Sequence, residues 1–297
     1  MGARSARARR TLFAALVAAL GALFVARPVA HAGPWTPEPG HGYAKLWLKW
    51  LPGFGYHAGD GATHGFGSYH ELFFSGYGEL GIAPRVALTL HAPFLQSYCL
   101  EDPRSGTVSS HVGVGDPALG VRWQALKLGR FAGALELRVR APLGEREPVQ
   151  TVYGTDAGNP AVGELRIGAG VWDLEADLDF GYGWDRVYLA GAFGAIARTG
   201  GFDDVIVWSA EIGARFSDHW SGRVRLHGYH SVRNGTEPRA ESPSGTGNGT
   251  TYTGFALEGE WTFVPKWQLG LTFEGGLLGV RRQTGGPVVS VFLATAW

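Results

Sequence analysis

Hydrophobic and polar residues alternate one by one along most of the chain beyond residue 42. The clearest case is 172–180, where every second residue (Asp173, Glu175, Asp177 and Asp179) is acidic and those between and beside them are apolar. A helix would scatter the four acids around its circumference, whereas an extended strand collects them on one face. No helical stripe of comparable length competes. The sequence therefore predicts an all-β protein.

The length and spacing of the alternating segments indicate a membrane barrel. They run for about ten residues, as a tilted membrane-crossing strand requires, whereas soluble strands average about five or six. We predict twelve strands, at 43–51, 69–81, 85–96, 113–125, 130–140, 170–183, 186–197, 205–216, 221–231, 252–263, 267–279 and 287–297. Short connections at 82–84, 126–129, 184–185, 217–220 and 264–266 alternate with longer ones at 52–67, 97–112, 141–165, 198–204, 232–251 and 280–286. This pattern predicts a transmembrane antiparallel β-barrel with both chain ends on the short-turn side.

The first 32 residues have the pattern of a cleaved signal peptide. Four arginines among residues 1–10 precede an apolar run at 11–26, and Ala30-His31-Ala32 offers a small-x-small cleavage site. We therefore expect a signal peptide at 1–32 and one outer-membrane barrel domain at 33–297. An uncleaved membrane anchor is the alternative, although the apolar run is short for a membrane helix.

Charge and cysteine content exclude several classes of function. The first 32 residues hold five of the 26 Lys and Arg and no acid, so the remainder carries 21 bases against 26 acids, a net charge of −5. That balance argues against a nucleic-acid partner. Cys99 is the single cysteine in the sequence, which excludes an intramolecular disulfide. Three histidines and an aspartate lie in and beside 52–67: His57, Asp60, His64 and His70. Their spacing fits no known metal motif, so we expect neither a metal nor a cofactor.

The last predicted strand supports the barrel independently. Its alternate residues Val289, Val291, Leu293, Thr295 and Trp297 share one face, and the sequence ends on the aromatic Trp297. This resembles the C-terminal signature of bacterial outer-membrane barrels, which end in Phe or Trp and are recognised there by the assembly machinery. The resemblance implies that Trp297 is an assembly signal, with the barrel-assembly machinery and outer-membrane lipids as partners. A terminal Trp on an ordinary edge strand is the alternative.

Two segments resemble a family of Gram-negative outer-membrane barrels named for the meta-pathway of phenol degradation. They are Gly-Val-Gly-Asp-Pro-Ala-Leu-Gly-Val-Arg-Trp at 113–123 and Ala-Leu-Glu-Leu-Arg-Val-Arg-Ala-Pro-Leu-Gly at 134–144, with 77–82 and 92–94 fitting upstream. The family's usual Thr-Gly is Leu143-Gly144 here. The resemblance, best over about 70–145, implies a β-barrel and a transport role. The family's name associates the solute with aromatic catabolism. The resemblance implies no catalytic residues.

If the apolar faces contact lipid, the charged residues of the same strands line the lumen. The candidates are Lys45, Lys49, Glu71, Glu79, Asp116, Arg122, Glu136, Arg138, Arg140, Asp173, Glu175, Asp177, Asp179, Glu211, Arg215, Arg223, Arg225, Glu258, Glu260 and Glu274. The basic row at 138–140 neighbours the acidic row at 173–179, and the basic row at 223–225 neighbours the acidic row at 258–260. Two arrangements stay open. The rows pair and fill a narrow barrel, or they face each other across a wet lumen and orient polar solutes.

Three classes of function fit a charged barrel. A channel or transporter for small solutes is favoured by the lumen charges and the resemblance. A lipid-modifying enzyme of the phospholipase or lipid A hydrolase type needs a Ser/His or His–metal group at the rim, and no local motif supplies one, although separate strands could assemble a triad. A non-conducting structural barrel is disfavoured by the modest loop lengths. We expect a non-enzymatic channel whose small-molecule solute the sequence does not identify.

Overall fold

The computed structural model describes residues 33–101, 106–145, 147–153 and 161–297, so the segment expected to be a signal peptide (1–32) lies outside the described residues. Within those ranges the chain forms sixteen strands: β1 (Gly42–His57), β2 (Thr63–Ala83), β3 (Val86–Glu101), β4 (Val108–Gly113), β5 (Ala118–Leu128), β6 (Phe131–Arg140), β7 (Val149–Tyr153), β8 (Ala161–Leu165), β9 (Asp173–Gly183), β10 (Val187–Arg198), β11 (Val205–Arg215), β12 (Trp220–Ser231), β13 (Thr251–Val264), β14 (Trp267–Arg281), β15 (Gln283–Thr284) and β16 (Val288–Ala296). In this described part, no helix is long and apolar enough to cross a membrane.

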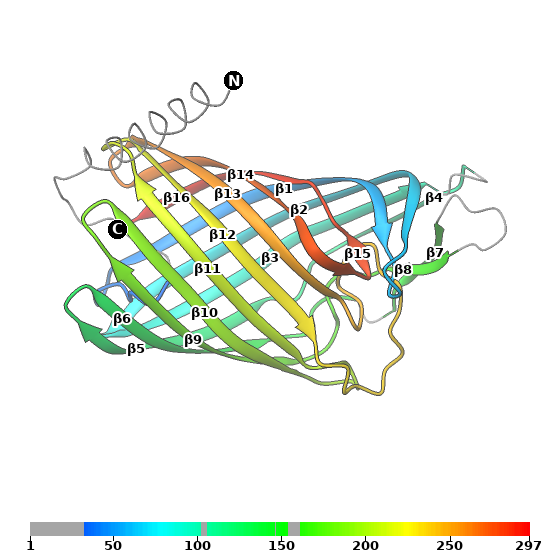
Figure 1. Cartoon of the computed structure of the whole chain (residues 1–297), viewed down its shortest axis with the longest axis horizontal. Helices are drawn as coiled ribbons and strands as arrows, with labels where there is room; N and C mark the ends of the chain where they lie inside the picture. Colours follow the sequence, from blue (N-terminus) through cyan, green and yellow to red (C-terminus); the bar gives the residue numbers. More distant parts are fainter. Residues whose placement is uncertain (1–32, 102–105, 146, 154–160) are drawn as a thin grey trace, which may run out of the picture.

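Twelve of these strands close into an antiparallel barrel, as the alternation predicts (Figure 1). The wall consists of β1, β2, β3, β5, β6, β9, β10, β11, β12, β13, β14 and β16. Closure occurs at β1, where Lys45 pairs with Tyr77 of β2 on one side and with Ala294 of β16 on the other. Each of the twelve therefore has a partner on both sides, which leaves the described wall without an open sheet edge.

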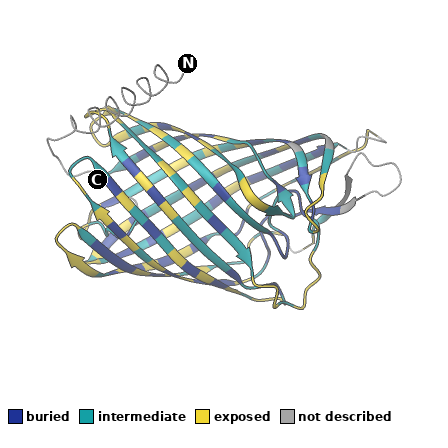
Figure 2. Cartoon of the chain, in the orientation of Figure 1, coloured by how far each residue is buried: buried dark blue, intermediate teal, exposed yellow. Residues whose placement is uncertain are grey.

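Buried and exposed residues alternate along the strands of the barrel wall (Figure 2), and the exposed ones are mainly apolar whereas many of the buried ones are charged. On β9, Asp173 and Asp177 are 3% and 4% exposed, whereas Leu174 and Leu178 are 54% and 59% exposed. Successive side chains of a strand point to opposite faces, so one face of every strand looks outward and the other into the lumen. An outward apolar face with a polar interior is the arrangement of membrane barrels and the reverse of a soluble one.

The strands are longer than predicted at one end of the barrel. β1 and β2 reach His57 and Thr63, so the expected loop at 52–67 shrinks to a short turn. The expected loop at 141–165 contains the β7–β8 hairpin. The predicted strand 113–125 is interrupted, because β4 ends at Gly113 and β5 begins at Ala118. Pro117, which has no N–H to donate to a ladder, precedes the restart.

The two ends of the barrel differ, with short turns at one and long connections at the other. The start of β1 and the C-terminus meet at the short-turn end, where the Gly42 N–H donates to the Trp297 carbonyl at 3.1 Å (Figure 1). At the opposite end, connections fold over the mouth and bury Leu165 and Ile167 in a cluster with Tyr56. The long-loop mouth is therefore a packed layer with its own apolar core.

Candidate functional site

Arg122 of β5 is the centre of the first ion-pair group on the inner wall. Its guanidinium donates to Glu136 of β6 at 2.7 and 2.9 Å and to Glu79 of β2 at 2.9 Å, and Asp179 of β9 lies 3.7 Å away. The antiparallel register explains the contact, because it sets Arg122 directly opposite Glu136. Arg122 is only 6% exposed, so it acts as a buried cation among three carboxylates.

A further row lies towards the long-loop end of the same wall. Arg138 of β6 donates to Glu175 of β9 at 2.8 Å. Arg140 of β6 and Arg198 of β10 both contact Asp173 of β9 at 3.2 Å, from opposite sides of that strand. The structure thus brings the basic row at 138–140 into contact with the acidic row at 173–179.

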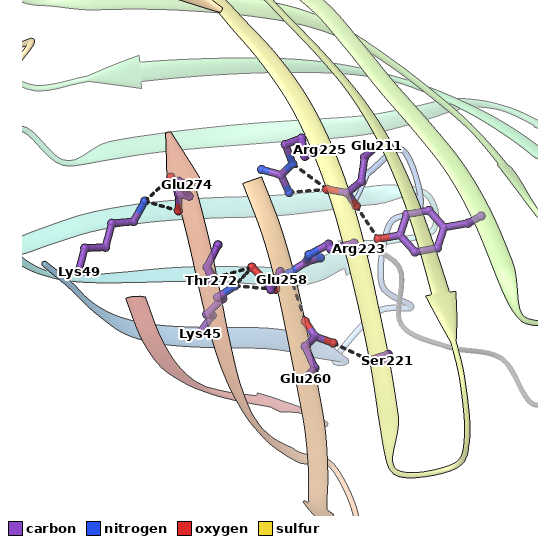
Figure 3. A network of polar contacts seen from close by, with 11 residues as sticks. Lys45, Lys49, Glu211, Ser221, Arg223, Arg225, Glu258, Glu260, Thr272 and Glu274 are labelled. Atoms are coloured by element: carbon purple, nitrogen blue, oxygen red, sulfur yellow. Dashed lines mark hydrogen bonds and ion pairs between the residues drawn. The ribbon is translucent and has the colours of Figure 1, made fainter. Parts of the chain in front are cut away.

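The other part of the wall carries a second group centred on Glu258 of β13 (Figure 3). Lys45 of β1 donates to its two oxygens at 2.9 and 3.0 Å, and the Thr272 hydroxyl of β14 donates at 3.0 Å. Arg223 of β12 contacts Glu258 and also lies 3.2 Å from Glu260. Glu258 therefore joins β1 to β12 across the intervening strands.

Two separate pairs flank this second group (Figure 3). Lys49 of β1 donates to Glu274 of β14 at 3.0 Å. Arg225 of β12 contacts Glu211 of β11 at 2.6 Å, and Glu211 also accepts the Tyr188 hydroxyl. The sequence placed Arg225 beside the acidic row at 258–260, but the register sets it directly opposite Glu211, so it pairs on the other side of β12.

In several of these pairs the base extends further into the lumen than its acid. The Arg140 side chain is 30% exposed and that of its partner Asp173 is 2% exposed. The Arg225 side chain is 42% exposed and that of Glu211 is 6% exposed. Long basic side chains carry their charge away from the wall, whereas the shorter acids stay against it. At these two pairs the base is therefore the charge that is more exposed to the lumen.

A cavity of about 350 Å³ lies in the lumen between these pairs and the connections over the mouth. Its walls combine aromatic residues with three bases: Trp47, Phe73, His91, Tyr229, Tyr252, Lys49, Arg140 and Arg198. The Trp47 and His91 rings stack with centroids 5.6 Å apart, and the Tyr229 and Tyr252 rings stack at 5.9 Å. The volume falls within the usual range for small-molecule sites.

Asp116, a predicted lumen residue, is hydrogen-bonded to a connection that lies over the long-loop mouth. Its carboxylate accepts the backbone N–H groups of Gly144, Ala169 and Gly170 at 2.7, 2.6 and 3.0 Å. These donors belong to the connection between β6 and β9, and their residues lie at least 28 positions away along the chain. Asp116 therefore anchors the segment 168–170 that roofs one side of the cavity.

Asp203 anchors the connection between β12 and β13 in a similar way. Its carboxylate accepts hydrogen bonds from Arg239 at 2.7 and 2.9 Å, from the Ser231 hydroxyl at 2.7 Å and from the Gly235 N–H at 2.8 Å. Burial alone would raise the pKa of Asp203, but these hydrogen bonds outweigh it and lower the pKa to about 2. The charged carboxylate is thus the form that the folded loop stabilises.

This pKa predicts a pH-dependent loosening of the loop at 232–240. A carboxylate with a lowered folded-state pKa stabilises the fold fully above its unfolded pKa, about 4, and loses that contribution as the pH falls to about 2. Protection factors of amide hydrogens in this loop should therefore drop between about pH 4 and 2. Asp203→Asn should show weak protection at both pH values. A drop of equal size in the variant would contradict the assignment.

The histidine group predicted near the first long loop is spread over two strands and a turn. His57 and His64 lie on the paired strands β1 and β2, and Asp60 lies in the turn between them. His70 is on the outer face and stacks on Trp50, with ring centroids 6.2 Å apart. Among the described residues, no three His, Cys, Asp or Glu side chains come together in a group that could hold a metal.

The sequence analysis missed Arg198 and the aromatic part of the cavity. Arg198 falls one residue beyond the predicted strand 186–197. It lies two positions after the buried Ile196, and residues two apart on a strand share a face, so extending the strand by one residue would have predicted Arg198 in the lumen. Trp47 lies on the same face as Lys45, so its position in the lumen follows from the same rule. The segments over the mouth carry no comparable pattern.

Comparison with solved structures places the fold among outer-membrane barrels. An outer-membrane channel from Pseudomonas putida F1 superposes with a TM-score of 0.61 at 14% identity, over 91% of this chain and 100% of that one. The KdgM porin gives 0.48 at 6% identity, over 86% of this chain and 99% of that one. The CymD monoaromatic hydrocarbon channel gives 0.42 at 10%, over 87% of each chain.

No protein-family model matches the sequence, and no curated protein matches it. The resemblance to the family named for the meta-pathway of phenol degradation therefore stays a prediction. At 14% identity, the likeness to the P. putida channel shows the barrel fold alone.

Proposed function

We propose that this protein is an outer-membrane channel through which small solutes cross. The observation that carries the proposal is a closed barrel whose outer face is apolar and whose inner face combines ion pairs with a cavity of about 350 Å³. A polar interior inside an apolar wall is the arrangement of outer-membrane barrels that carry polar molecules across lipid. The barrel fold shared with the P. putida channel supports the same function.

The proposed surroundings follow from the outer face. Leu174, Leu178 and Phe180 of β9 are at least half exposed, and in a bilayer they would contact acyl chains of outer-membrane lipids. Trp297 follows β16 at the short-turn end and is 45% exposed, a position open to recognition by the barrel-assembly machinery during biogenesis. The proposed location is therefore the outer membrane, reached after removal of the signal peptide.

The proposed solutes include aromatic compounds. The resemblance to the meta-pathway family implies this class, and the stacked rings of Trp47 with His91 and of Tyr229 with Tyr252 supply aromatic surfaces in the cavity. Flat solutes stack on such rings with a gain of about 0.5–1.5 kcal/mol beyond simple burial.

Purified protein in planar bilayers and liposomes tests the channel. We expect discrete conductance steps in bilayers and swelling of liposomes in small solutes, with no release of fatty acid from phospholipid or lipid A. Absence of both conductance and swelling would contradict the channel. Lipid hydrolysis that a single Ser or His substitution abolishes would favour the lipid-modifying enzyme instead.

We propose that the long-loop end of the barrel faces the medium and the short-turn end faces the periplasm, as in outer-membrane barrels. Single cysteines at Arg233 or Glu237, which are exposed in the long connection between β12 and β13, should react with an impermeant maleimide in intact cells. A cysteine at Lys266, in the short turn between β13 and β14, should not. Positions such as Ser242 and Asn248 are unsuitable because they are buried. A Cys99→Ala background removes the native thiol, and the opposite labelling pattern would invert the barrel.

A further inference from the structure

We propose that the cavity is a binding site for small organic anions that carry a flat apolar group, the class of aromatic carboxylates. The inference rests on the proposed channel function and adds the charge of the solute. Three observations carry it: a pair of guanidinium groups that share one carboxylate, a lysine on another part of the cavity wall, and stacked rings between them.

The guanidinium groups of Arg140 and Arg198 share a single carboxylate. Both lie 3.2 Å from Asp173, through Nη1 of Arg140 and through Nε of Arg198. Two positive charges therefore face one negative charge, and Asp173 is buried behind them at 3% exposure. Each guanidinium has five N–H donors, of which the described ion pair with Asp173 uses only one nitrogen. The Arg198 side chain is only 4% exposed and its guanidinium lies over the Phe202 ring at 4.6 Å, so the donors open to an anion in the cavity are chiefly those of Arg140.

Lys49 adds a third cation from β1. Its side chain is 30% exposed, and its partner Glu274 does not line the cavity. Among the described residues that line the cavity, the one acid is Asp116, and three backbone N–H groups already engage its carboxylate. Asp173 and Glu274 balance these bases from behind and do not line the cavity, so the charges that a solute meets first on these parts of the wall are the cations.

The rings occupy the space between the basic groups. Register aligns His91 of β3 with Ala118 of β5 and Ala118 with Arg140 of β6, so His91 and Arg140 lie in one row across three strands. The Trp47 ring stacks on His91 at an interplanar angle of 17°. A flat apolar group can pack on these rings while its carboxylate reaches the guanidinium donors. An ammonium group at the same place would meet like charges.

Calorimetric titration of the purified barrel in detergent tests the charge preference. The probes are benzoate, benzyl alcohol and benzylamine, which share one ring and differ in charge. We expect benzoate to bind at least about tenfold more tightly than the other two, as one or two charge-assisted hydrogen bonds provide. Equal affinities, or tighter binding of benzylamine, would overturn the proposal.

Arg140→Gln locates the site. The variant keeps Arg198 on Asp173, so it leaves no buried carboxylate without a partner, and mobility on unheated gels checks that it folds. Benzoate affinity should fall about tenfold, with little change for benzyl alcohol. Arg130→Gln is the control, because Arg130 lies at the short-turn end on an exposed pair with Asp185. An equal loss of benzoate affinity in both variants, or no loss in Arg140→Gln, would contradict the site. If Arg140→Gln does not fold, the ranking of the three probes on the wild type still tests the proposal.

Bilayer recordings separate this inference from the channel function. If the wild type conducts and benzoate interrupts the current more often than benzylamine, both proposals are supported. Conductance without that difference overturns the anion site and leaves the channel standing. Absence of conductance with selective benzoate binding overturns the channel and also the transport role of the site.

Discussion

Arg122→Met should destabilise the barrel by about 3–5 kcal/mol, because it removes the cation that lies among the carboxylates of Glu79, Glu136 and Asp179. Glu79 and Glu136 are 8% and 3% exposed, so neither gains water when the guanidinium is removed. Glu136 keeps the Thr89 hydroxyl at 2.7 Å and Arg138 at 3.5 Å, whereas Glu79 has no second ion pair among the described residues. Equilibrium unfolding in urea, with the protein in liposomes, measures the loss.

Arg130→Met is the matched control for this substitution. It removes the same side chain from an ion pair with Asp185 in which both partners are exposed, at 51% and 34%. Exposed pairs contribute about 0–1 kcal/mol, so the control should unfold almost as the wild type does. Adding Glu79→Gln to Arg122→Met should recover part of the stability, since it removes the buried carboxylate that loses its ion pair. Equal stability of the two Arg→Met variants would show that the buried group contributes nothing.

The barrel was predictable from the sequence because lipid and lumen impose opposite requirements on alternate residues. On β9 each inward residue from Asp173 to Asp179 is acidic and each outward one is apolar, so the strand is evident without any contact information. Beyond the lipid the outer face of a strand meets water while the inner face packs against the connections over the mouth, so apolar-out and polar-in no longer alternate. This is why the extensions of β1 to His57 and of β2 from Thr63 were predicted as loop.

The ion pairs were only partly predictable, because pairing depends on register. Arg225 has Glu211 on one neighbouring strand and the acidic row at 258–260 on the other, and only the register decides that Glu211 is its partner. The segment 168–170 over the cavity is held by contacts between residues far apart in the sequence, such as Asp116 with the N–H of Gly170. No local sequence pattern predicts such contacts. The bases on the cavity lining were unpredictable for a third reason, which is that the strand pattern does not show that Asp173 and Glu274 lie off the lining while their basic partners are on it.

Ala176→Arg should lower the yield of barrel that folds into liposomes, at a cost of about 2–4 kcal/mol, because it places a charge on the lipid face near the middle of β9. Ala176 is exposed on the outer wall, and its register partner on β6 is Leu137, which is 49% exposed on the same face. An arginine there has no carboxylate neighbour, and lipid offers it no water. The folding yield is measured on unheated gels for liposomes of different bilayer thickness. It should fall most in the thicker bilayers, because there the arginine side chain lies further from the membrane interface.

Asp177, the residue next to Ala176, supplies the control on the opposite face of β9. Asp177→Asn removes a charge in the lumen, but its partner Arg138 keeps Glu175 at 2.8 Å and has Glu136 within 3.5 Å, so no cation is left alone. Folding yield should therefore stay close to that of the wild type. Ala176→Leu, which keeps the lipid face apolar, should also fold normally. If Ala176→Arg folded as well as these two variants, the outer face of β9 could not be in contact with lipid, because a soluble barrel would tolerate a surface arginine at that position.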